Sequence, residues 1–596
     1  MRWLLLLSLL AGLGVCKPEP QPPPPPIPRS ATSDKDKEAI APEAATGWRI
    51  VAGVRGERQV VVAAHPEAAR AGQRVLREGG NALDASIAMA IMLTLVEPQS
   101  SGIGGGALLL HWDGRKLRAY DGRETAPAAA TGDMFLDKRG KPREFTDAVV
   151  GGLSVGVPGE IAVLELAHRA HGKLPWAKLF APAIELAEKG FPISERLHSL
   201  LGLARDLPKI EPAASYFYTR DKQPKPVGTI LKNPELAATL RAIAEGGAKA
   251  FYEGDIGQAI VKTVKSARNP GRLALPDLKG YRPVEREPLC MRYRRFRACA
   301  MPPPTSGGLA ALQIFGMLER FDLPAKDPRA PEVVHLFAEA SKLAYADRDA
   351  YVADPDFVDV PSARLLDPSY LAERSKLIDP KRAMATAAPG KLDDKGSQWV
   401  PGRAAELPST THLVAVDGSG NAVSLSASIE SAFGSHLMVR GFLLNNQLTD
   451  FSFVPEVDGK PVANRVEPKK RPRSSMTPLL VLDESGKEFV LSLGSPGGAR
   501  IIDYVARVAI DVLDFKLDPQ TAIARPHVVN RNGNTELEAH ARERAWVDTT
   551  KIALEKLGHR VEVLDLNSGL HGILRLPKGG YAGGADPRRE GLALAD

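Results

Sequence analysis

The pattern of secondary structure changes near residue 410, and this change limits the folds open to the chain. Helix-like spacing dominates the first two thirds, whereas strand-like runs joined by glycine turns open the last third. The spacing predicts helices over 67–77, 82–95, 159–170, 181–189 and 331–351. It predicts strands over 107–112, 412–417, 422–428, 442–444, 479–482 and 489–493. No repeat of 20–50 residues is present, so the sequence predicts a mixed α/β fold rather than a solenoid or propeller.

The composition is that of a globular protein and excludes several classes. Of the 596 residues 44% are hydrophobic and 25% charged, which rules out disorder of the bulk, collagen-like repeats and a multispan membrane protein. A net charge of +7 is a weak bias over this length and does not indicate a nucleic-acid partner. The three cysteines show no C-x-x-C spacing, so they indicate no metal site, and the sequence shows no recognisable cofactor pocket. Two strands joined by a turn would bring Cys290 and Cys299 together, but the sequence leaves their pairing open.

The first 47 residues predict an export signal followed by a tether. Arg2 precedes an apolar run over 3–15, which is shorter than the roughly 20 residues that span a bilayer. Cys16 stands where a bacterial lipoprotein carries its lipidated cysteine, although Val15 precedes it where a small residue is preferred, so lipidation stays open. Residues 16–47 are rich in proline and polar residues and predict a disordered tether. We therefore expect a protein of the bacterial periplasm or cell envelope, with a globular part that begins near Trp48.

One candidate nucleophile is Ser154, in a G-x-S-x-G segment over 152–156. This pattern resembles the nucleophile elbow of α/β-hydrolases, and a strand-like run over 147–150 precedes it. Pro158 follows closely, however, and no acid and histidine follow in the required order. A glycine turn before a helix is the favoured interpretation.

The second candidate is Thr410, within Pro408-Ser409-Thr410-Thr411-His412. A threonine hydroxyl is a poor nucleophile unless a base lies beside it. Cleavage of the chain before Thr410 would free an α-amine with a pKa near 8, which can act as that base. This arrangement needs neither a histidine nor a metal ion.

Three segments of the last third supply the remaining parts of such a site. An amide and a carboxylate can hold an ammonium group, paired hydroxyls can hold a carboxylate, and a Pro-Gly-Gly turn can offer backbone N–H groups to an oxyanion. The residues are, in this order, Gln447 and Asp450, Ser474 and Ser475, and Gly497 and Gly498. Each is common as a structural turn, so their occurrence together is the informative signal.

Over residues 48–590 the chain resembles the γ-glutamyltranspeptidase family of N-terminal nucleophile hydrolases. Besides the segments above, the matching motifs are GGNALD (79–84), GIGGG (102–106), DGRETAP (121–127), GVPG (156–159), MPPPTSGG (301–308), AYADR (344–348), DPDF (354–357) and DPR (586–588). The resemblance implies an α/β four-layer αββα sandwich. It also implies self-cleavage between Ser409 and Thr410 into a large subunit, 48–409, and a small catalytic subunit, 410–596. These products would remain one intertwined heterodimer.

The resemblance also implies the reaction and the role of each site residue. Thr410 would attack the γ-carbonyl of glutathione or another γ-glutamyl amide, and the resulting ester would pass to water or to an amino acid or peptide acceptor. In this mechanism Gly497 and Gly498 would form the oxyanion hole, and Ser428 would orient the nucleophile. The substrate carboxylate would bind Arg123, Ser474 and Ser475. The substrate ammonium would bind Glu430, Gln447 and Asp450. No metal ion or cofactor is implied.

Three departures from the family pattern bear on the substrate. Glu430 stands where many members have asparagine, and Thr449 replaces the first aspartate of a D-D pair. The segment between Ser452 and Lys469, which carries a lid loop in many members, looks shorter and has no aromatic residue after Phe453. A reduced lid would admit bulkier substrates such as γ-glutamyl polymers. The alternatives are a cephalosporin-type acylase of the same fold and a non-catalytic envelope protein.

Overall fold

The computed structural model describes residues 49–392, 399–400, 402 and 409–596. The predicted export signal, the tether and Cys16 lie outside these residues. In the described part, no helix is both long and apolar enough to cross a membrane.

Two antiparallel seven-stranded sheets form the centre of the molecule. The first has the order β1 (Val54–Gly56), β22 (Tyr581–Ala585), β21 (His571–Arg575), β17 (Phe489–Gly494), β16 (Leu479–Asp483), β9 (Phe296–Ala300) and β8 (Leu289–Tyr293). The second has the order β23 (Leu592–Ala595), β2 (Val60–Ala63), β10 (Thr411–Val416), β11 (Ala422–Ser428), β3 (Gly106–Trp112), β4 (Leu117–Gly122) and β7 (Val284–Arg286). Both sheets contain strands from before and after residue 410, so the two parts of the chain share one core.

The alternation of apolar residues along β10 explains the layering. Val414 and Val416 belong to the apolar cluster between the two sheets, which also contains Leu480. Leu413 and Ala415 point the other way, into the cluster formed with the helices on the outer face. A strand that is apolar on both faces must be covered on both sides.

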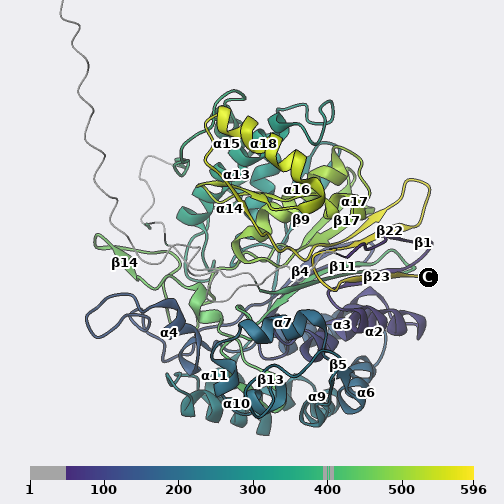
Figure 1. Cartoon of the computed structure of the whole chain (residues 1–596), viewed down its shortest axis with the longest axis vertical. Coiled ribbons are helices and arrows are strands. Elements are labelled where there is room, and N and C mark those ends of the chain that lie inside the picture. The colour runs from purple at the N-terminus through teal and green to yellow at the C-terminus, as the bar shows by residue number, and fades with distance from the viewer. Residues whose placement is uncertain (1–48, 393–398, 401, 403–408) are drawn as a thin grey trace, which may run out of the picture.

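Helices cover the two outer faces of the sheet pair, as Figure 1 shows. One layer contains α2 (Pro66–Arg77), α3 (Ala82–Val96), α5 (Glu160–His171), α6 (Ala181–Lys189), α9 (Pro234–Glu253) and α10 (Asp255–Ser266). The opposite layer contains α12 (Gly307–Leu318), α13 (Pro331–Tyr351), α16 (Ile501–Leu513) and α18 (Arg544–Lys556). The predicted αββα sandwich is confirmed.

Shorter elements complete the described chain. The helices are α4 (Phe145–Val149), α7 (Glu195–Leu203), α8 (Ala213–Phe217), α11 (Leu275–Gly280), α14 (Ser362–Leu365), α15 (Pro368–Lys376) and α17 (Pro519–Ala524). The strands outside the two large sheets are β5 (Phe191–Pro192), β6 (Ile230–Leu231), β12 (Met438–Val439), β13 (Phe442–Leu443), β14 (Glu456–Val457), β15 (Lys460–Pro461), β18 (Val528–Asn530), β19 (Thr535–Glu538) and β20 (Val561–Leu564).

Most of the predicted elements are present, and one is wrong. The helices over 181–189 and 331–351 and the strand over 422–428 have the predicted bounds. The run over 147–150 is not a strand, because residues 147–149 form the end of α4 and Val150 follows the helix. Phe145 and Val149 are four residues apart and bury one face of this helix, with Phe453 packed against them.

The open question of the two cysteines is answered by the register of β8 and β9. Cys290 pairs with Cys299 across the two strands, their Cα atoms are 4.1 Å apart, and the side chains form a disulfide.

Candidate active site

Thr410 lies directly before β10, at the end of the strand where β11 finishes with Ser428. Its hydroxyl donates a hydrogen bond to the Ser428 hydroxyl, with an Oγ1–Oγ distance of 3.0 Å. The residue is buried, and its φ of 114° is rare for a β-branched residue. Thr410 therefore has a strained backbone at the position that directly follows Ser409.

The neighbouring histidine does not serve as a base for Thr410. His412 is buried between the sheets, where its Nδ1 lies 2.9 Å from the Ser426 hydroxyl. Burial holds its pKa well below the ordinary value, so the ring is neutral. A Cβ atom on Gly494 of the facing sheet would lie 2.2 Å from this ring. His412 therefore packs the two sheets together.

A pocket in front of Thr410 collects most of the predicted site residues. Its lining residues are Thr410, Ser428, Glu430, Gln447, Asp450, Ser474, Ser475, Met476, Gly498 and Ile501. Segments far apart in the sequence thus meet at the end of β10. Among the predicted residues, Arg123, Gly497 and Ser409 do not line it.

Asp450 is the centre of a charged group on one side of the pocket. The Gln447 amide donates to its Oδ2 at 2.9 Å, and a guanidinium nitrogen of Arg123 donates to the same oxygen. Arg123 is fully buried behind the pocket and also donates to the carbonyl oxygens of Pro472 and Arg473, at 3.1 and 2.9 Å. It therefore connects Asp450 with the segment that leads into Ser474.

Two buried carboxyl groups stand behind Arg123. Burial raises the pKa of Glu124 to about 8, although the Arg123 guanidinium, 3.5 Å away, opposes the shift. Burial and the charge of Glu124 raise the pKa of Glu160 to about 8 as well. Both groups are therefore mostly protonated at neutral pH, and Asp450 is the carboxylate that Arg123 pairs with.

One of the paired hydroxyls, that of Ser475, is held by an arginine to which the sequence assigned no role. Arg348 of α13 donates to the Ser475 hydroxyl and to the Ser306 hydroxyl, each at 2.8 Å. Ser306 in turn donates to the carbonyl oxygen of Ser474 at 2.7 Å. Arg348 is the last residue of the AYADR motif, so the sequence marks this arginine. Its contact with Ser475, however, depends on the fold.

The two departures from the family pattern, Glu430 and Thr449, share one partner. The side-chain amide of Asn446 donates to a carboxylate oxygen of Glu430 and, at 3.1 Å, to the Thr449 hydroxyl. The backbone N–H of Glu430 donates to the Ser428 hydroxyl at 2.9 Å. Glu430 thus connects Ser428, the hydrogen-bond partner of Thr410, to the pocket wall.

Gly497 and Gly498 form the turn between β17 and α16. Their φ values are 137° and 58°, in the region that favours glycine, and a Cβ atom on Gly497 would lie 2.7 Å from the ring of Tyr504. Gly498 lines the pocket opposite Thr410's strand. The turn therefore needs these two glycines for steric reasons as well as for any exposed N–H groups.

The alternative nucleophile and the lid segment lie elsewhere. Ser154 is fully buried, and its hydroxyl donates to the carbonyl oxygen of Val149 at 2.6 Å, so it is a turn residue. The segment after Ser452 forms the small β14–β15 hairpin. Phe453 stacks on Phe135, with ring centroids 4.5 Å apart.

One group in the described residues has the composition of a metal site. His335, Glu339 and His559 are buried together in the helical layer of α13. The two imidazoles, however, hydrogen-bond directly at 2.7 Å, and the Lys342 ammonium donates to Glu339 at 2.8 Å. The group is a satisfied polar network next to a cation.

Two packed sheets between helical layers, with a threonine at the start of a central strand, define the N-terminal nucleophile hydrolase class. The gamma-glutamyltranspeptidase family model matches residues 68–595. The chain therefore belongs to the γ-glutamyltranspeptidase family of enzymes.

Similar proteins are named either as glutathione hydrolases and γ-glutamyltranspeptidases or as acylases. The glutathione hydrolase proenzyme of Bacillus subtilis (strain 168) is 35% identical over 558 residues, which cover 90% of this chain and 92% of the relative. The cephalosporin acylase from Bacillus halodurans is similar in structure, with a TM-score of 0.79, 28% identity, and coverage of 97% of this chain and 99% of that chain. The γ-glutamyltranspeptidase of Helicobacter pylori has a TM-score of 0.55 and 35% identity, and covers 59% of this chain and 100% of that chain.

Proposed function

We propose that this enzyme cleaves γ-glutamyl amides such as glutathione and transfers the γ-glutamyl group to water or to an amino acid or peptide. The observation that carries the proposal is the pairing of Arg123 with Asp450 next to Ser474 and Ser475. A γ-glutamyl group ends in an ammonium and a carboxylate on one carbon atom. A cation and an anion side by side match that zwitterion.

The γ-glutamyl group is then recognised when Arg123 and Asp450 exchange each other for the carboxylate and the ammonium of the substrate. The substrate ammonium binds Asp450, Gln447 and Glu430, and the substrate carboxylate binds Ser474, Ser475 and Arg123. Each buried charge keeps an opposite charge beside it throughout, which limits the desolvation cost of binding. The Arg348 contact at 2.8 Å keeps the Ser475 hydroxyl in position.

The chemistry proceeds through an ester on Thr410. Its α-amine accepts the hydroxyl proton while Oγ1 attacks the γ-carbonyl carbon, and the oxyanion is held by the N–H groups of Gly497 and Gly498. The ammonium returns its proton to the leaving nitrogen as the amide bond breaks. Water or an acceptor amine then attacks the ester and restores the threonine. Ser428, 3.0 Å from Oγ1, orients the nucleophile.

The free α-amine requires self-cleavage between Ser409 and Thr410, into a large subunit ending at Ser409 and a small subunit over 410–596. The strained φ of 114° at Thr410 supports this step. Strain of this kind costs on the order of 1–3 kcal/mol, and it is released when Thr410 becomes an N-terminus.

We also propose that the protein is exported to the periplasm or cell envelope. The basic and apolar start of the sequence and the Cys290–Cys299 disulfide support export, because disulfides persist in oxidising compartments. The N-terminus of the mature protein, and its mass with and without Cys16→Ser, tests both export and a lipid anchor.

A cephalosporin-type acylase is the second candidate, because of the likeness to the Bacillus halodurans structure. A glutaryl side chain has the γ-carbonyl but lacks the α-ammonium. The Arg123–Asp450 pair therefore favours the γ-glutamyl substrate.

The decisive experiment compares the purified wild type with Thr410→Ala. Intact masses and fragment N-termini should give a fragment that begins at Thr410 in the wild type only. The processed enzyme should cleave γ-glutamyl-p-nitroanilide far faster than glutaryl-p-nitroanilide, and a dipeptide acceptor should raise the γ-glutamyl rate. A preference for the glutaryl anilide would support the acylase. A folded, uncleaved wild type without turnover would support the non-catalytic alternative.

A further inference from the structure

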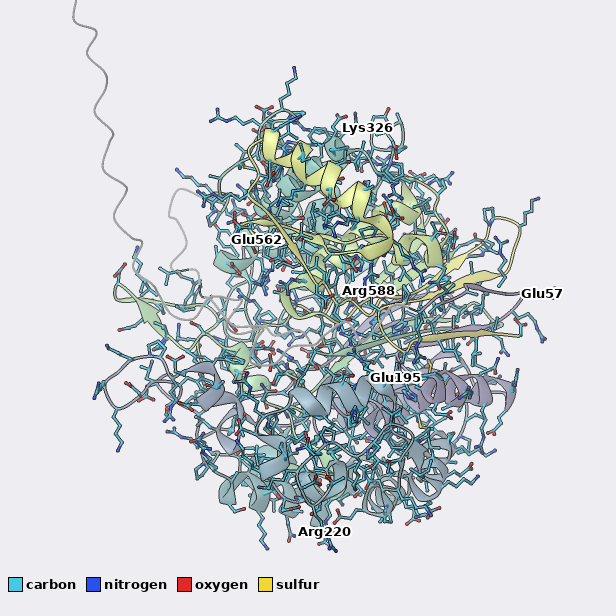
Figure 2. All side chains as sticks on the ribbon, viewed as in Figure 1. Glu57, Glu195, Arg220, Lys326, Glu562 and Arg588 are labelled. Atoms are coloured by element: carbon cyan, nitrogen blue, oxygen red, sulfur yellow. A yellow bond between two sulfur atoms is a disulfide. The ribbon has the colours of Figure 1, made fainter. Side chains whose placement is uncertain are left out.

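The long helix α13 runs from the surface of the molecule towards the pocket. Just before its start Lys326, marked in the upper part of Figure 2, donates to Glu332 in the first helical turn at 2.8 Å. From residue 333 to residue 348 every residue is buried. Tyr345 and Arg348 are three residues apart, so they leave the helix on the same face. The Cζ atom of Arg348 lies 5.7 Å from the centre of the Tyr345 ring, so the two side chains lie together.

Tyr345 contacts the turn that carries the two glycines. Its hydroxyl donates a hydrogen bond to the carbonyl oxygen of Ala499, the residue after Gly498. Its ring belongs to the apolar cluster that also contains Ile501 and Tyr504 of α16. Tyr345 does not line the pocket, whereas Gly498 does. The tyrosine therefore holds the turn from outside the pocket, at the point where the turn enters α16.

Arg348 contacts a second segment of the pocket wall. Its Nη2 donates to the Ser475 hydroxyl and its Nε to the Ser306 hydroxyl, each at 2.8 Å. A guanidinium can only donate, so both hydroxyl oxygens accept from it and their protons point elsewhere. The Ser306 hydroxyl donates to the carbonyl oxygen of Ser474 at 2.7 Å, and the Ser306 N–H donates to the same oxygen at 2.8 Å. Arg348 and Ser306 together therefore hold both serines of the pair.

We infer that α13 positions two parts of the site independently: Tyr345 fixes the oxyanion turn, and Arg348 with Ser306 fixes the hydroxyls that bind the substrate carboxylate. The inference rests on the function proposed above. None of these three residues lines the pocket, so they are positioning residues rather than catalytic ones. The AYADR segment thus serves the reaction without touching the substrate.

The two supports act on different stages of the reaction. The oxyanion is absent from the bound substrate, so a displaced turn lowers kcat and leaves substrate binding nearly unchanged. The carboxylate is already present in the bound substrate, so a displaced serine pair weakens binding and raises KM. A substrate without the carboxylate gains nothing from the serine pair and is insensitive to its position. These differences separate the two roles from a general loss of packing.

The test uses two anilides that differ only in the carboxylate, γ-glutamyl-p-nitroanilide and 4-aminobutanoyl-p-nitroanilide. With processed enzyme, Tyr345→Phe should lower kcat about tenfold on both, with KM little changed. Arg348→Gln should lower kcat/KM about 30-fold on the first, chiefly through KM, and hardly at all on the second. Arg348→Lys keeps the charge but loses the planar fork of donors, so its loss should lie in between. Equal losses on both anilides in Arg348→Gln, or a kcat loss in Tyr345→Phe on one anilide only, would overturn the inference.

Two further variants guard against misfolding. Ser306→Ala removes a single hydroxyl and should lower kcat/KM about fivefold on the γ-glutamyl anilide alone, so an unchanged value would contradict the inference. The matched control is Arg374→Gln, because Arg374 donates to Asp347 and to the Leu343 carbonyl of the same helix, at 3.0 and 3.1 Å, and does not line the pocket. It should lower the melting temperature and leave the ratio of the two rates unchanged. A changed ratio would mean that any loosening of α13 alters the site, and it would overturn the separate roles.

A readout without substrate separates this inference from the proposed function. Backbone hydrogen exchange, measured by mass spectrometry on the processed enzyme, should become faster in residues 497–501 for Tyr345→Phe and in residues 474–477 for Arg348→Gln. Each variant should leave the other segment at the wild-type rate. Unchanged exchange, or faster exchange in both segments for either variant, would overturn the inference. A wild type that turns over neither anilide would contradict the proposed function, while the exchange experiment would still test Tyr345 and Arg348.

Discussion

Replacing Asp450 by asparagine should separate recognition of the amino-acid headgroup from the chemistry at Thr410. The side chain keeps its shape and its contact with the Gln447 amide, 2.9 Å away, but loses the charge that we assign to the substrate ammonium. A hydrogen bond to a charged group contributes about 1.5–3 kcal/mol, and the ionic attraction in a buried site adds to it. We expect a loss of about 3 kcal/mol, or a fall of about 100-fold in kcat/KM.

The fold should survive this change because a second carboxyl stands beside Arg123. Burial is the main cause that raises the pKa of Glu124 to about 8, and the charge of Asp450 adds to the shift. Without that charge the pKa of Glu124 moves downward, and this carboxyl, 3.5 Å from the Arg123 guanidinium, is the group that can take over part of the charge balance. The variant should therefore fold and self-process, which a denaturing gel will verify.

The assay compares γ-glutamyl-p-nitroanilide with glutaryl-p-nitroanilide, which lacks the ammonium. Asp450→Asn should lose about 100-fold on the first substrate and little on the slow reaction of the second. An equal loss on both substrates would refute the reasoning, because it would show that Asp450 supports the catalytic turn rather than the ammonium. The matched control is Gln447→Glu, which adds a negative charge beside Asp450, whereas Asp450→Asn removes one.

Three further predictions follow from the described contacts. Ser428→Ala removes the partner of the Thr410 hydroxyl and should lower kcat about tenfold with KM little changed, as single-turnover acylation will measure. Cys290→Ala with Cys299→Ala opens a short loop that does not line the pocket, so the free energy of unfolding should fall by about 2–3 kcal/mol while kcat/KM stays the same. The pKa of the Glu160 carboxyl is about 8 in the folded protein and about 4.5 in the unfolded chain. The free energy of unfolding therefore falls as the pH rises from about 4.5 to about 8. Glu160→Gln should therefore gain in melting temperature over the wild type from pH 5 to pH 8, and a constant difference would contradict the burial of this carboxyl.

The elements with strong local signals could be predicted from the sequence. The helix over 331–351 begins with a proline, which is favoured in a first helical turn, and it has the predicted bounds. The prediction of a strand over 147–150 is wrong, because a run of three apolar residues after Asp147 fits either period and the packing of Phe453 decides between them. The order of the strands in the two sheets, with β10 between β2 and β11, has no local signal at all.

The pocket was predictable in composition but not in geometry. The residues that line it stand in recognisable motifs, and the structure brings them to the end of β10. The position of Arg123 behind Asp450 could not be foreseen, since it depends on contacts with the carbonyl groups of Pro472 and Arg473. Contacts of this kind join residues more than 300 positions apart.

Arg348 and Arg589 show what limits motif reading in such a site. Both lie in or beside segments that resemble the family, yet neither motif says what its arginine touches. Arg348 reaches Ser475 only because α13 packs beside the loop that carries the serine, and Arg589 reaches Thr410 only because the C-terminal segment passes the end of β10. In the proposed mechanism Thr410 is both nucleophile and base, and the side chains around it come from segments distant in sequence. The residues of the proposed site are therefore readable from their motifs, whereas the contacts that hold them in place become visible only when the fold is assembled.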